Sequence, residues 1–185
     1  MTLRHVPSYC LAVLLCLFTN DFASARSGTH AYLLRGIFNV SVGLDALAGK
    51  LSRAGIASSV YGPQEGDSVA AEAIRDYRSH KVHSIILIGH SLGAGGVVLV
   101  AEQLETAGVP VSLLISLDPV STMAVPRNVR RVVNFYIAGS GAALVGGPGF
   151  HGALQNINLS GVPGMDHMTI QATAAMHRRM MAYVR

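Results

Sequence analysis

Residues 84–93 read Ser84-Ile-Ile-Leu-Ile-Gly-His-Ser-Leu-Gly93, and this stretch decides how the chain folds. Four consecutive apolar residues, typical of a buried strand, run into a Gly-x-Ser-x-Gly turn, and a helix-like run of mostly small residues follows. Such a turn lifts a serine hydroxyl clear of a sheet, and it needs glycines because side chains there would collide with the adjacent backbone. We therefore predict a nucleophile elbow with Ser91 as candidate nucleophile. The other elbow residues are Gly89, His90 and Gly93.

The motif by itself is a weak signal. In a chain with 20 glycines among 185 residues, the same spelling arises by chance in roughly a fifth of shuffled sequences. The alternative is an ordinary Gly-Ser turn. The strand before the motif and the helix after it favour the elbow, because the geometry needs both.

Residues 1–25 have the pattern of a secretory signal peptide. A basic start at Arg4 precedes an apolar stretch over residues 9–18, and Ala23-Ser24-Ala25 resembles a signal peptidase site. The apolar stretch is shorter than the ~20 residues that a membrane-spanning helix needs. We expect an exported protein, periplasmic or secreted, with no stable membrane anchor.

Residues 26–185 are expected to form a single domain. Both cysteines, Cys10 and Cys16, lie in the predicted signal peptide, so disulfide bonds do not stabilise this domain. Half of the residues are hydrophobic, and a domain of this length buries ~70% of the surface that its unfolded chain exposes. Its stability must come from the core.

The charge pattern gives no sign of nucleic-acid binding. The net charge is +4 and the sequence pI is about 9.4, yet only 13% of residues are charged. The densest basic cluster is His177-Arg178-Arg179 with Arg185, on a predicted C-terminal helix. No aromatic residues interleave with it, so we interpret it as a solvated helix face.

Strand-like and helix-like segments alternate along residues 26–185. Short apolar or β-branched segments predict strands over residues 31–35, 56–61, 84–88, 111–117, 132–137 and 154–159. Helices are predicted over residues 41–54, 67–79, 92–106 and 168–184, with Ser41 and Asp67 as capping residues of the first two. This alternation predicts a parallel sheet covered by helices on both faces. The glycine-rich residues 139–152 are predicted to form a mobile loop above the sheet.

A serine nucleophile needs a base to take its proton and an acid to orient that base. Asp118 is the candidate acid, because it follows a predicted strand and stands where that strand leaves the sheet. The alternative for Asp118 is a turn-forming Asp-Pro pair with Pro119. Asp166 is a poor candidate, because it is adjacent to the favoured base and cannot readily reach that residue's ring.

His167 is the favoured base among eight histidines. It follows the last predicted strand and precedes the last predicted helix, so its loop meets the sheet at the same edge as Ser91 and Asp118. His151, in the glycine-rich stretch, is the competing candidate and is interpreted as a structural loop residue. The remaining histidines lie in the signal peptide, at the far edge of the sheet, inside the elbow or within the last helix.

The oxyanion that forms on acyl attack needs two N–H donors. One is expected from Leu92, the residue after the serine. The second is expected after the first strand, where Arg35-Gly36-Ile37-Phe38 places an N–H of Ile37 behind a glycine. Phe38 is the alternative donor, and a plain glycine turn is the alternative to an oxyanion turn.

Gly89-His90-Ser91-Leu92-Gly93, Asp118 and His167, in this order, resemble the lipase, esterase and thioesterase branch of the α/β-hydrolase superfamily, including its small exported bacterial members. The resemblance covers nearly all of residues 30–185. It implies a mostly parallel six-stranded sheet in the order 2-1-3-4-5-6, with helices on both faces. It also implies a minimal α/β-hydrolase fold, because no insertion is long enough to form a cap domain. Arg35 departs from the family, in which many lipases have histidine.

The resemblance implies an exported serine hydrolase that cleaves a small-molecule carboxylic ester or thioester through a Ser-His-Asp triad and an acyl-enzyme. Ser91 would be the nucleophile, His167 the base and Asp118 the orienting acid. Neither a metal nor an organic cofactor is expected. Two alternatives stay open: an acyltransferase that uses the same triad, and a catalytically silent binding domain on the same fold.

Overall fold

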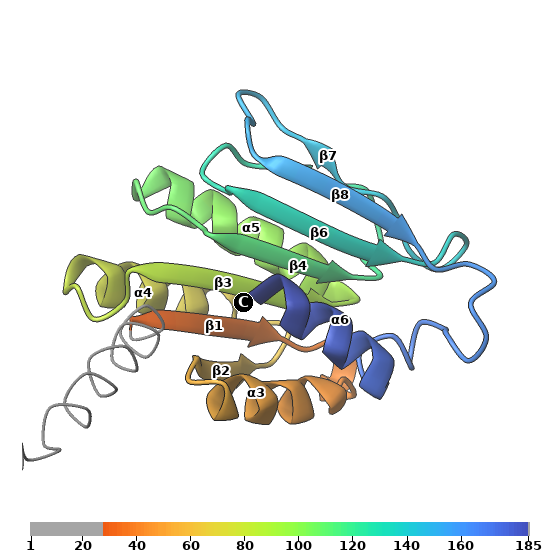
Figure 1. Ribbon diagram of the computed structural model, residues 1–185. Coiled ribbons are helices and arrows are strands. Elements are labelled where there is room, and N and C mark those ends of the chain that lie inside the picture. Colours follow the sequence, from red (N-terminus) through yellow and green to blue (C-terminus); the bar gives the residue numbers. More distant parts are fainter. Residues whose placement is uncertain (1–27, 185) are drawn as a thin grey trace, which may run out of the picture.

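Six parallel strands form one sheet in the order β2-β1-β3-β4-β6-β8 (Figure 1). The computed structural model describes residues 28–184, so the predicted signal peptide, both cysteines and Arg185 lie outside the described residues. Counted without two short strands, this order is the predicted 2-1-3-4-5-6. The strands are β1 (Thr29–Leu34), β2 (Ala57–Tyr61), β3 (Ser84–His90), β4 (Leu113–Leu117), β6 (Arg131–Tyr136) and β8 (Ala153–Asn158).

Helices cover both faces of the sheet. Helices α3 (Gly43–Arg53) and α6 (Ala174–Val184) lie in front of it in Figure 1, and α4 (Gly66–Arg78) and α5 (Leu92–Thr106) lie behind it. Among residues 28–184, no helix is long and apolar enough to span a membrane.

The position of strand β3 between two hydrophobic cores explains why its sequence is continuously apolar. Ile85 and Leu87 point into the core beneath α4 and α5, whereas Ile86 and Ile88 point into the core beneath α3 and α6. All four side chains are buried. Because successive side chains of a strand alternate between the two faces, a strand covered on both sides must be apolar at every position.

Two helix starts differ from the prediction. Helix α3 begins at Gly43, and the Ser41 hydroxyl does not cap it but accepts the Gly36 N–H across the turn after β1. Helix α4 begins at Gly66, and Asp67 in its first turn accepts a hydrogen bond from Gln103 of α5. Each side chain therefore bonds to a group other than the helix end that its local pattern indicated.

The last helix is shorter than predicted. Helix α6 begins at Ala174, and the Thr173 hydroxyl accepts the Met176 N–H as a cap. Residues 168–173 form turns instead. Their backbone bonds include Ile170 N–H to the Asp166 carbonyl. These turns give the chain room to carry His167 back to the sheet edge.

The glycine-rich residues 139–152 do not form a free loop. They contain strand β7 (Val145–Gly146), which pairs with β5 (Ala124–Val125) in a separate two-stranded sheet. The Asn156 amide of β8 both donates to and accepts from the Leu144 backbone, and buried Asn134 of β6 donates to the Ala142 carbonyl. Buried Leu144 joins the core beneath α4 and α5. Hydrogen bonds and apolar packing therefore hold this segment against the sheet.

Candidate active site

Ser91 lies in a strained turn between β3 and α5. Its backbone has φ 57° and ψ −120°, a combination that residues other than glycine rarely adopt. A methyl group added at Gly89 would lie 2.1 Å from the Gly93 carbonyl oxygen, and one added at Gly93 would lie 2.3 Å from the Leu34 carbonyl oxygen. Both glycines are thus required by backbone contacts, which is the geometry that the elbow predicts.

The structure brings Ser91, His167 and Asp118 into one hydrogen-bonded row. His167 Nε2 lies 3.0 Å from Ser91 Oγ, and His167 Nδ1 lies 2.6 Å from Asp118 Oδ2. Both contacts are within hydrogen-bond distance. A carboxylate beside Nδ1 favours the tautomer with a proton there, which leaves Nε2 free to accept the Ser91 proton.

Asp118 is completely buried at the carboxyl end of β4. Oδ1 accepts the Ile137 N–H at 2.7 Å, and Oδ2 accepts the Ser140 hydroxyl at 2.7 Å in addition to His167. Three donors thus satisfy a carboxylate that burial would otherwise destabilise. Ser140 was not among the residues predicted for the site, because its position in a glycine-rich stretch carries no signal of contact with Asp118.

A compact turn presents His167. Asp166 Oδ1 accepts the N–H groups of Met168 and Thr169, both at 2.8 Å, so its carboxylate is occupied by its own turn. The Thr169 N–H is the largest cause that lowers the pKa of the exposed Asp166. Asp166 therefore organises the loop and leaves the ring of His167 to Asp118.

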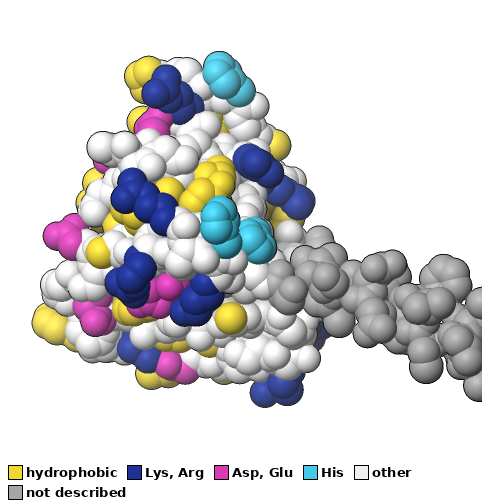
Figure 2. All heavy atoms as spheres, turned by 90° about the vertical axis from the view of Figure 1, so that its left-hand side faces the viewer, with side chains coloured by type: hydrophobic (Ala, Val, Ile, Leu, Met, Phe, Trp, Pro, Cys, Tyr) yellow, Lys and Arg dark blue, Asp and Glu magenta, His cyan; other side chains and the backbone are white. Residues whose placement is uncertain are grey.

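The other candidate histidine lies at the opposite edge of the sheet. His151 is exposed and stands just before β8 begins, whereas the triad residues follow the carboxyl ends of their strands. His80 and His83 lie at the amino end of β3. Figure 2 shows the left-hand side of Figure 1, where histidine side chains lie on the surface together with Lys and Arg side chains. The positions of His80, His83 and His151 place all three far from the Ser91 hydroxyl along the strand direction.

The turn after β1 passes directly beside the serine. A methyl group added at Gly36 would lie 3.1 Å from Ser91 Cβ. Ile37 begins a 3₁₀ turn, η1 (Ile37–Asn39), in which Phe38 and Asn39 both have positive φ. Within the described part of the chain, the N–H groups of Ile37, Phe38 and Leu92 donate no hydrogen bond. Unpaired N–H groups next to a serine hydroxyl are the feature that an oxyanion hole requires.

Arg35, at the position where many lipases have histidine, stabilises the same turn. Its guanidinium forms a two-pronged ion pair with Asp45 of α3, with Nε 3.2 Å from Oδ2 and Nη2 in contact with Oδ1. A bidentate pair fixes orientation as well as distance. This pair connects the first turn of α3 to the segment that leads into Gly36.

Exposed apolar side chains directly follow the site residues along the chain. Phe38 is 83% exposed, although its backbone has the unusual φ of 54°. The other exposed apolar side chains at or next to site residues in sequence are Ile37, Leu92 and Met168, and Val120 lies two residues after Asp118. Exposed apolar side chains therefore adjoin Ser91, His167 and the turn after β1 along the chain.

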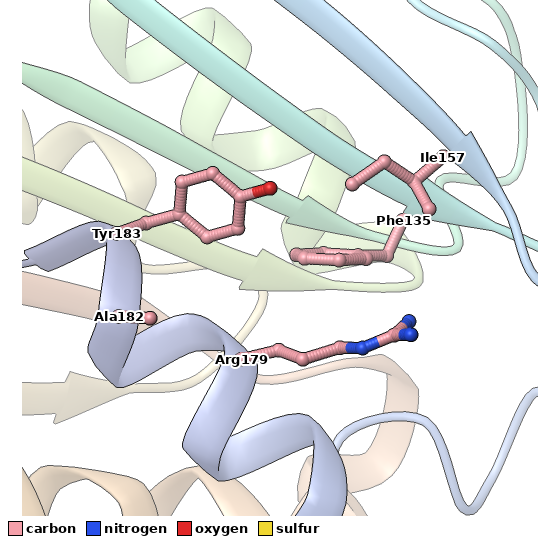
Figure 3. Close-up of a pocket in the computed structure, with 5 residues that line it drawn as sticks. All are labelled: Phe135, Ile157, Arg179, Ala182 and Tyr183. Atoms are coloured by element: carbon pink, nitrogen blue, oxygen red, sulfur yellow. The ribbon is translucent and has the colours of Figure 1, made fainter.

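A separate pocket of about 340 Å³ lies between α6 and the sheet. Figure 3 shows its lining residues, which come from β6, β8 and α6. They are Phe135, Ile157, Arg179, Ala182 and Tyr183. None belongs to the triad, so this pocket is distinct from the candidate active site. Among residues 28–184, no group of three or more His, Cys, Asp or Glu side chains is arranged to hold a metal ion.

No protein-family model matches the chain, and no curated protein is detectably similar to it in sequence. Solved structures do resemble it. RedJ, a thioesterase from the prodiginine biosynthetic pathway in Streptomyces coelicolor, matches with a TM-score of 0.55 and 12% identity, over 98% of this chain and 96% of RedJ. Human thioesterase 2 matches with a TM-score of 0.59 and 10% identity, over 85% of this chain and 94% of its own.

BorB, the type II thioesterase from the borrelidin biosynthetic cluster, matches with a TM-score of 0.56 and 11% identity, over 86% of this chain and 94% of BorB. At such identities the similarity establishes the fold. The chain has the thioesterase-like α/β-hydrolase fold.

Proposed function

We propose that the chain is a serine hydrolase that cleaves a carboxylic ester or thioester through an acyl-enzyme formed on Ser91. The observation that carries this proposal is the unbroken hydrogen-bond row from Asp118 through His167 to Ser91. Unpaired N–H groups lie on the two segments that flank the serine. A silent binding domain has no need of either feature.

The first half of the reaction forms the acyl-enzyme. Ser91 Oγ attacks the acyl carbonyl carbon while its proton moves to His167 Nε2, and the N–H groups of Leu92 and Ile37 stabilise the oxyanion. The tetrahedral intermediate then collapses. The bond from carbon to the leaving oxygen or sulfur breaks, and His167 gives its proton to the departing alcohol or thiol.

The second half releases the acid. Water attacks the acyl-enzyme while His167 Nε2 takes one of its protons, and the same donors hold the second oxyanion. Collapse breaks the bond between the acyl carbon and Ser91 Oγ, which recovers the proton from His167. Throughout, Asp118 keeps the imidazole in the required tautomer and stabilises its charged form.

We place the acyl group of the substrate against the exposed apolar side chains around Ser91. Ile37 and Leu92 carry the proposed oxyanion donors and Met168 follows the base, and each of these side chains is between 41% and 50% exposed. A surface of this kind accommodates a short acyl group. A buried methylene would add ~0.8 kcal/mol of binding, but a methylene that stays in water adds nothing.

Activity-based labelling with a fluorophosphonate, followed by assays on matched acyl esters and thioesters, tests this proposal. Ser91→Ala should abolish labelling, and Ser91→Ala and His167→Ala should each lower turnover by several orders of magnitude. The double variant should be little worse than either, because the groups act as a unit. The control is His151→Ala, which should keep its activity. Normal turnover by folded Ser91→Ala would refute the proposal.

We also propose that residues 1–25 direct export to the periplasm or beyond the cell. The support is the charge, length and small-residue pattern of that segment. Mass spectrometry of protein recovered from outside the cytoplasm should find Arg26 at the amino terminus. Recovery of the uncleaved chain from the cytoplasm alone would contradict export.

A further inference from the structure

A chain of hydrogen bonds runs beneath Ser91 and joins the two segments on either side of it. The Gly36 N–H donates to Ser41 Oγ at 2.8 Å, and Ser41 Oγ lies 2.6 Å from His90 Nδ1. On the other side of the ring, His90 Nε2 lies 2.7 Å from the backbone carbonyl oxygen of His167. The bridge thus begins at the turn after β1 and ends at the loop that carries the base.

The chemistry of the two end groups fixes every proton in this bridge. The His167 carbonyl can only accept, so His90 Nε2 carries a proton and donates it. The Gly36 N–H can only donate, so Ser41 Oγ accepts it and directs its own proton to His90 Nδ1. Each of the three donors then has one acceptor, provided that the His90 ring is neutral.

The surroundings keep that ring neutral and the bridge dry. Ser41 is completely buried and His90 is 1% exposed, so water does not compete for their hydrogen bonds. Burial is the main cause that lowers the pKa of His90 to about 4. The ring centroids of His90 and His167 are 4.9 Å apart. A neutral His90 therefore puts no second positive charge beside the base when that base is protonated.

We propose that Ser41 and His90 are positioning residues, whose bridge from Gly36 to the His167 carbonyl holds the oxyanion turn and the catalytic histidine in register on either side of Ser91. This inference rests on the proposed function. The bridge extends that function to two further residues, because the elbow motif gives His90 no role and helix capping was the only role predicted for Ser41.

Catalysis depends on the position of the oxyanion turn relative to His167 and Ser91. The proposed donor Ile37 directly follows Gly36, and the reacting atoms of His167 and Ser91 must meet within a few tenths of an ångström of their productive geometry. A displacement of about 1 Å can lower a rate by about a hundredfold, even when the displaced group lies away from the reacting atoms. Neither Ser41 nor His90 Nδ1 touches Ser91 Oγ in the bridge, so each acts through the backbone that it holds.

The principal test is Ser41→Ala, with Ser116→Ala as its matched control. Ser116 is also completely buried, but its hydroxyl has no hydrogen-bond partner within the described residues. Each substitution removes one buried serine hydroxyl, but only Ser41→Ala breaks the bridge. We expect kcat to fall about ten- to a hundredfold in Ser41→Ala with KM within about twofold, and no change in Ser116→Ala.

A second readout separates positioning from loss of stability. A boronic acid that adds to Ser91 mimics the tetrahedral intermediate, so its affinity should fall in Ser41→Ala by the same factor as kcat/KM. Ser41→Thr keeps the hydroxyl and should recover most of the lost kcat. An unchanged boronic acid affinity, or equal losses in Ser41→Ala and Ser116→Ala, would overturn the proposal.

The wild-type protein provides a measurement that does not depend on a variant folding. Nitrogen-15 NMR should find His90 as the neutral tautomer with its proton on Nε2 at pH 7, and a proton on Nδ1 would overturn the bridge. Failure of the proposed function looks different. In that case Ser91→Ala would keep full turnover, whereas failure of this inference leaves Ser91 essential and Ser41→Ala fully active.

Discussion

Ser91 and Asp118 are positioned by different kinds of interaction. Around Ser91 the chain is held by backbone packing, because Gly89 and Gly93 lie so close to neighbouring carbonyl groups that no side chain fits. Around Asp118 the chain is held by polar contacts, because Ile137 and Ser140 donate hydrogen bonds to its carboxylate. Both residues have positive φ, 57° and 50°, so both ends of the triad are on strained backbone.

The difference affects how substitutions around Ser91 and around Asp118 reduce activity. A packing constraint is local, and one methyl group can break it. A hydrogen-bonded carboxylate depends on a distant segment, which Asn134 and Asn156 hold in turn by bonding to Ala142 and Leu144. Changes to the hydrogen-bond partners of Asp118 should therefore lower activity in steps of graded size, whereas a side chain added at Gly89 or Gly93 should abolish it.

The largest effect is expected from Asp118→Asn. Because the Ile137 N–H continues to need an acceptor, the amide oxygen should take the Oδ1 position and the NH₂ group should face His167 Nδ1. The amide then donates to Nδ1, and the ring proton moves to Nε2, where it cannot accept the Ser91 proton. Turnover should fall by up to ~10⁴ while the protein stays folded. If the folded variant were fully active in steady-state assays, Asp118 would not be the acid that orients His167.

The next effect tests the packing side with Gly89→Ala. The new methyl group would lie 2.1 Å from the Gly93 carbonyl oxygen, so the strand and the helix must move apart. We expect urea unfolding to show a loss of at least about 3 kcal/mol, together with loss of fluorophosphonate labelling.

The matched control for Gly89→Ala is Gly49→Ala in the middle of α3. There the nearest atom to a new methyl group is the flexible tip of Arg53, at 3.5 Å. Alanine favours a helix interior, so this variant should gain about 0.5–1 kcal/mol. A stable, labelled Gly89→Ala protein would show that the elbow tolerates a side chain and that backbone contact does not position Ser91.

The contrast between packing and polar contacts also explains what the sequence could predict about the fold. The six main strands, their order and the helices on both faces were predicted correctly, because continuous apolar runs and their alternation with helices carry that information. The cap at Ser41 and the early start of the last helix were wrong. In both places a residue distant in sequence, His90 for Ser41 and Ser91 for His167, is the partner that the local pattern did not reveal.

For the candidate site, the sequence predicted the residues that the structure brings together at Ser91, because each follows a strand at the same sheet edge. Their catalytic roles stay a prediction. The supporting groups could not be foreseen. Ser140 and the bridge through Ser41 depend on side chains that meet across 22 and 49 positions of sequence, and no periodicity or motif records such contacts.

A third effect concerns pH and tests whether the Ser91 side also depends on a polar group. Burial lowers the pKa of His90 from its ordinary 6.5 to about 4, so between these pH values the unfolded chain binds a proton at His90 that the folded chain does not. The neutral His90 ring therefore contributes fully to the stability of the folded chain above about pH 6.5, and this contribution is lost as the pH falls toward 4. Its size is about 3 kcal/mol.

Urea unfolding of the wild type and His90→Gln across pH 4 to 7 measures this contribution. The variant lacks the titrating ring, so its stability should fall less steeply with acid. Burial also lowers the pKa values of His30 and His177, but both proteins contain these residues, and the difference between the two curves isolates His90. Parallel curves would mean that His90 titrates alike in the folded and unfolded chain.

The smallest effect is expected from Ser140→Ala, which removes one of the three donors to Asp118. Ile137 and His167 still hold the carboxylate, and a hydrogen bond to a charged group contributes about 1.5–3 kcal/mol, part of which water recovers because this segment borders solvent. We expect kcat to fall roughly tenfold with KM unchanged. Ser160→Ala is the control, since its hydroxyl accepts the Ala138 N–H on the same segment without touching Asp118. If both variants lose activity equally, the segment matters as a whole, and Ser140 does not position the acid through its own hydrogen bond.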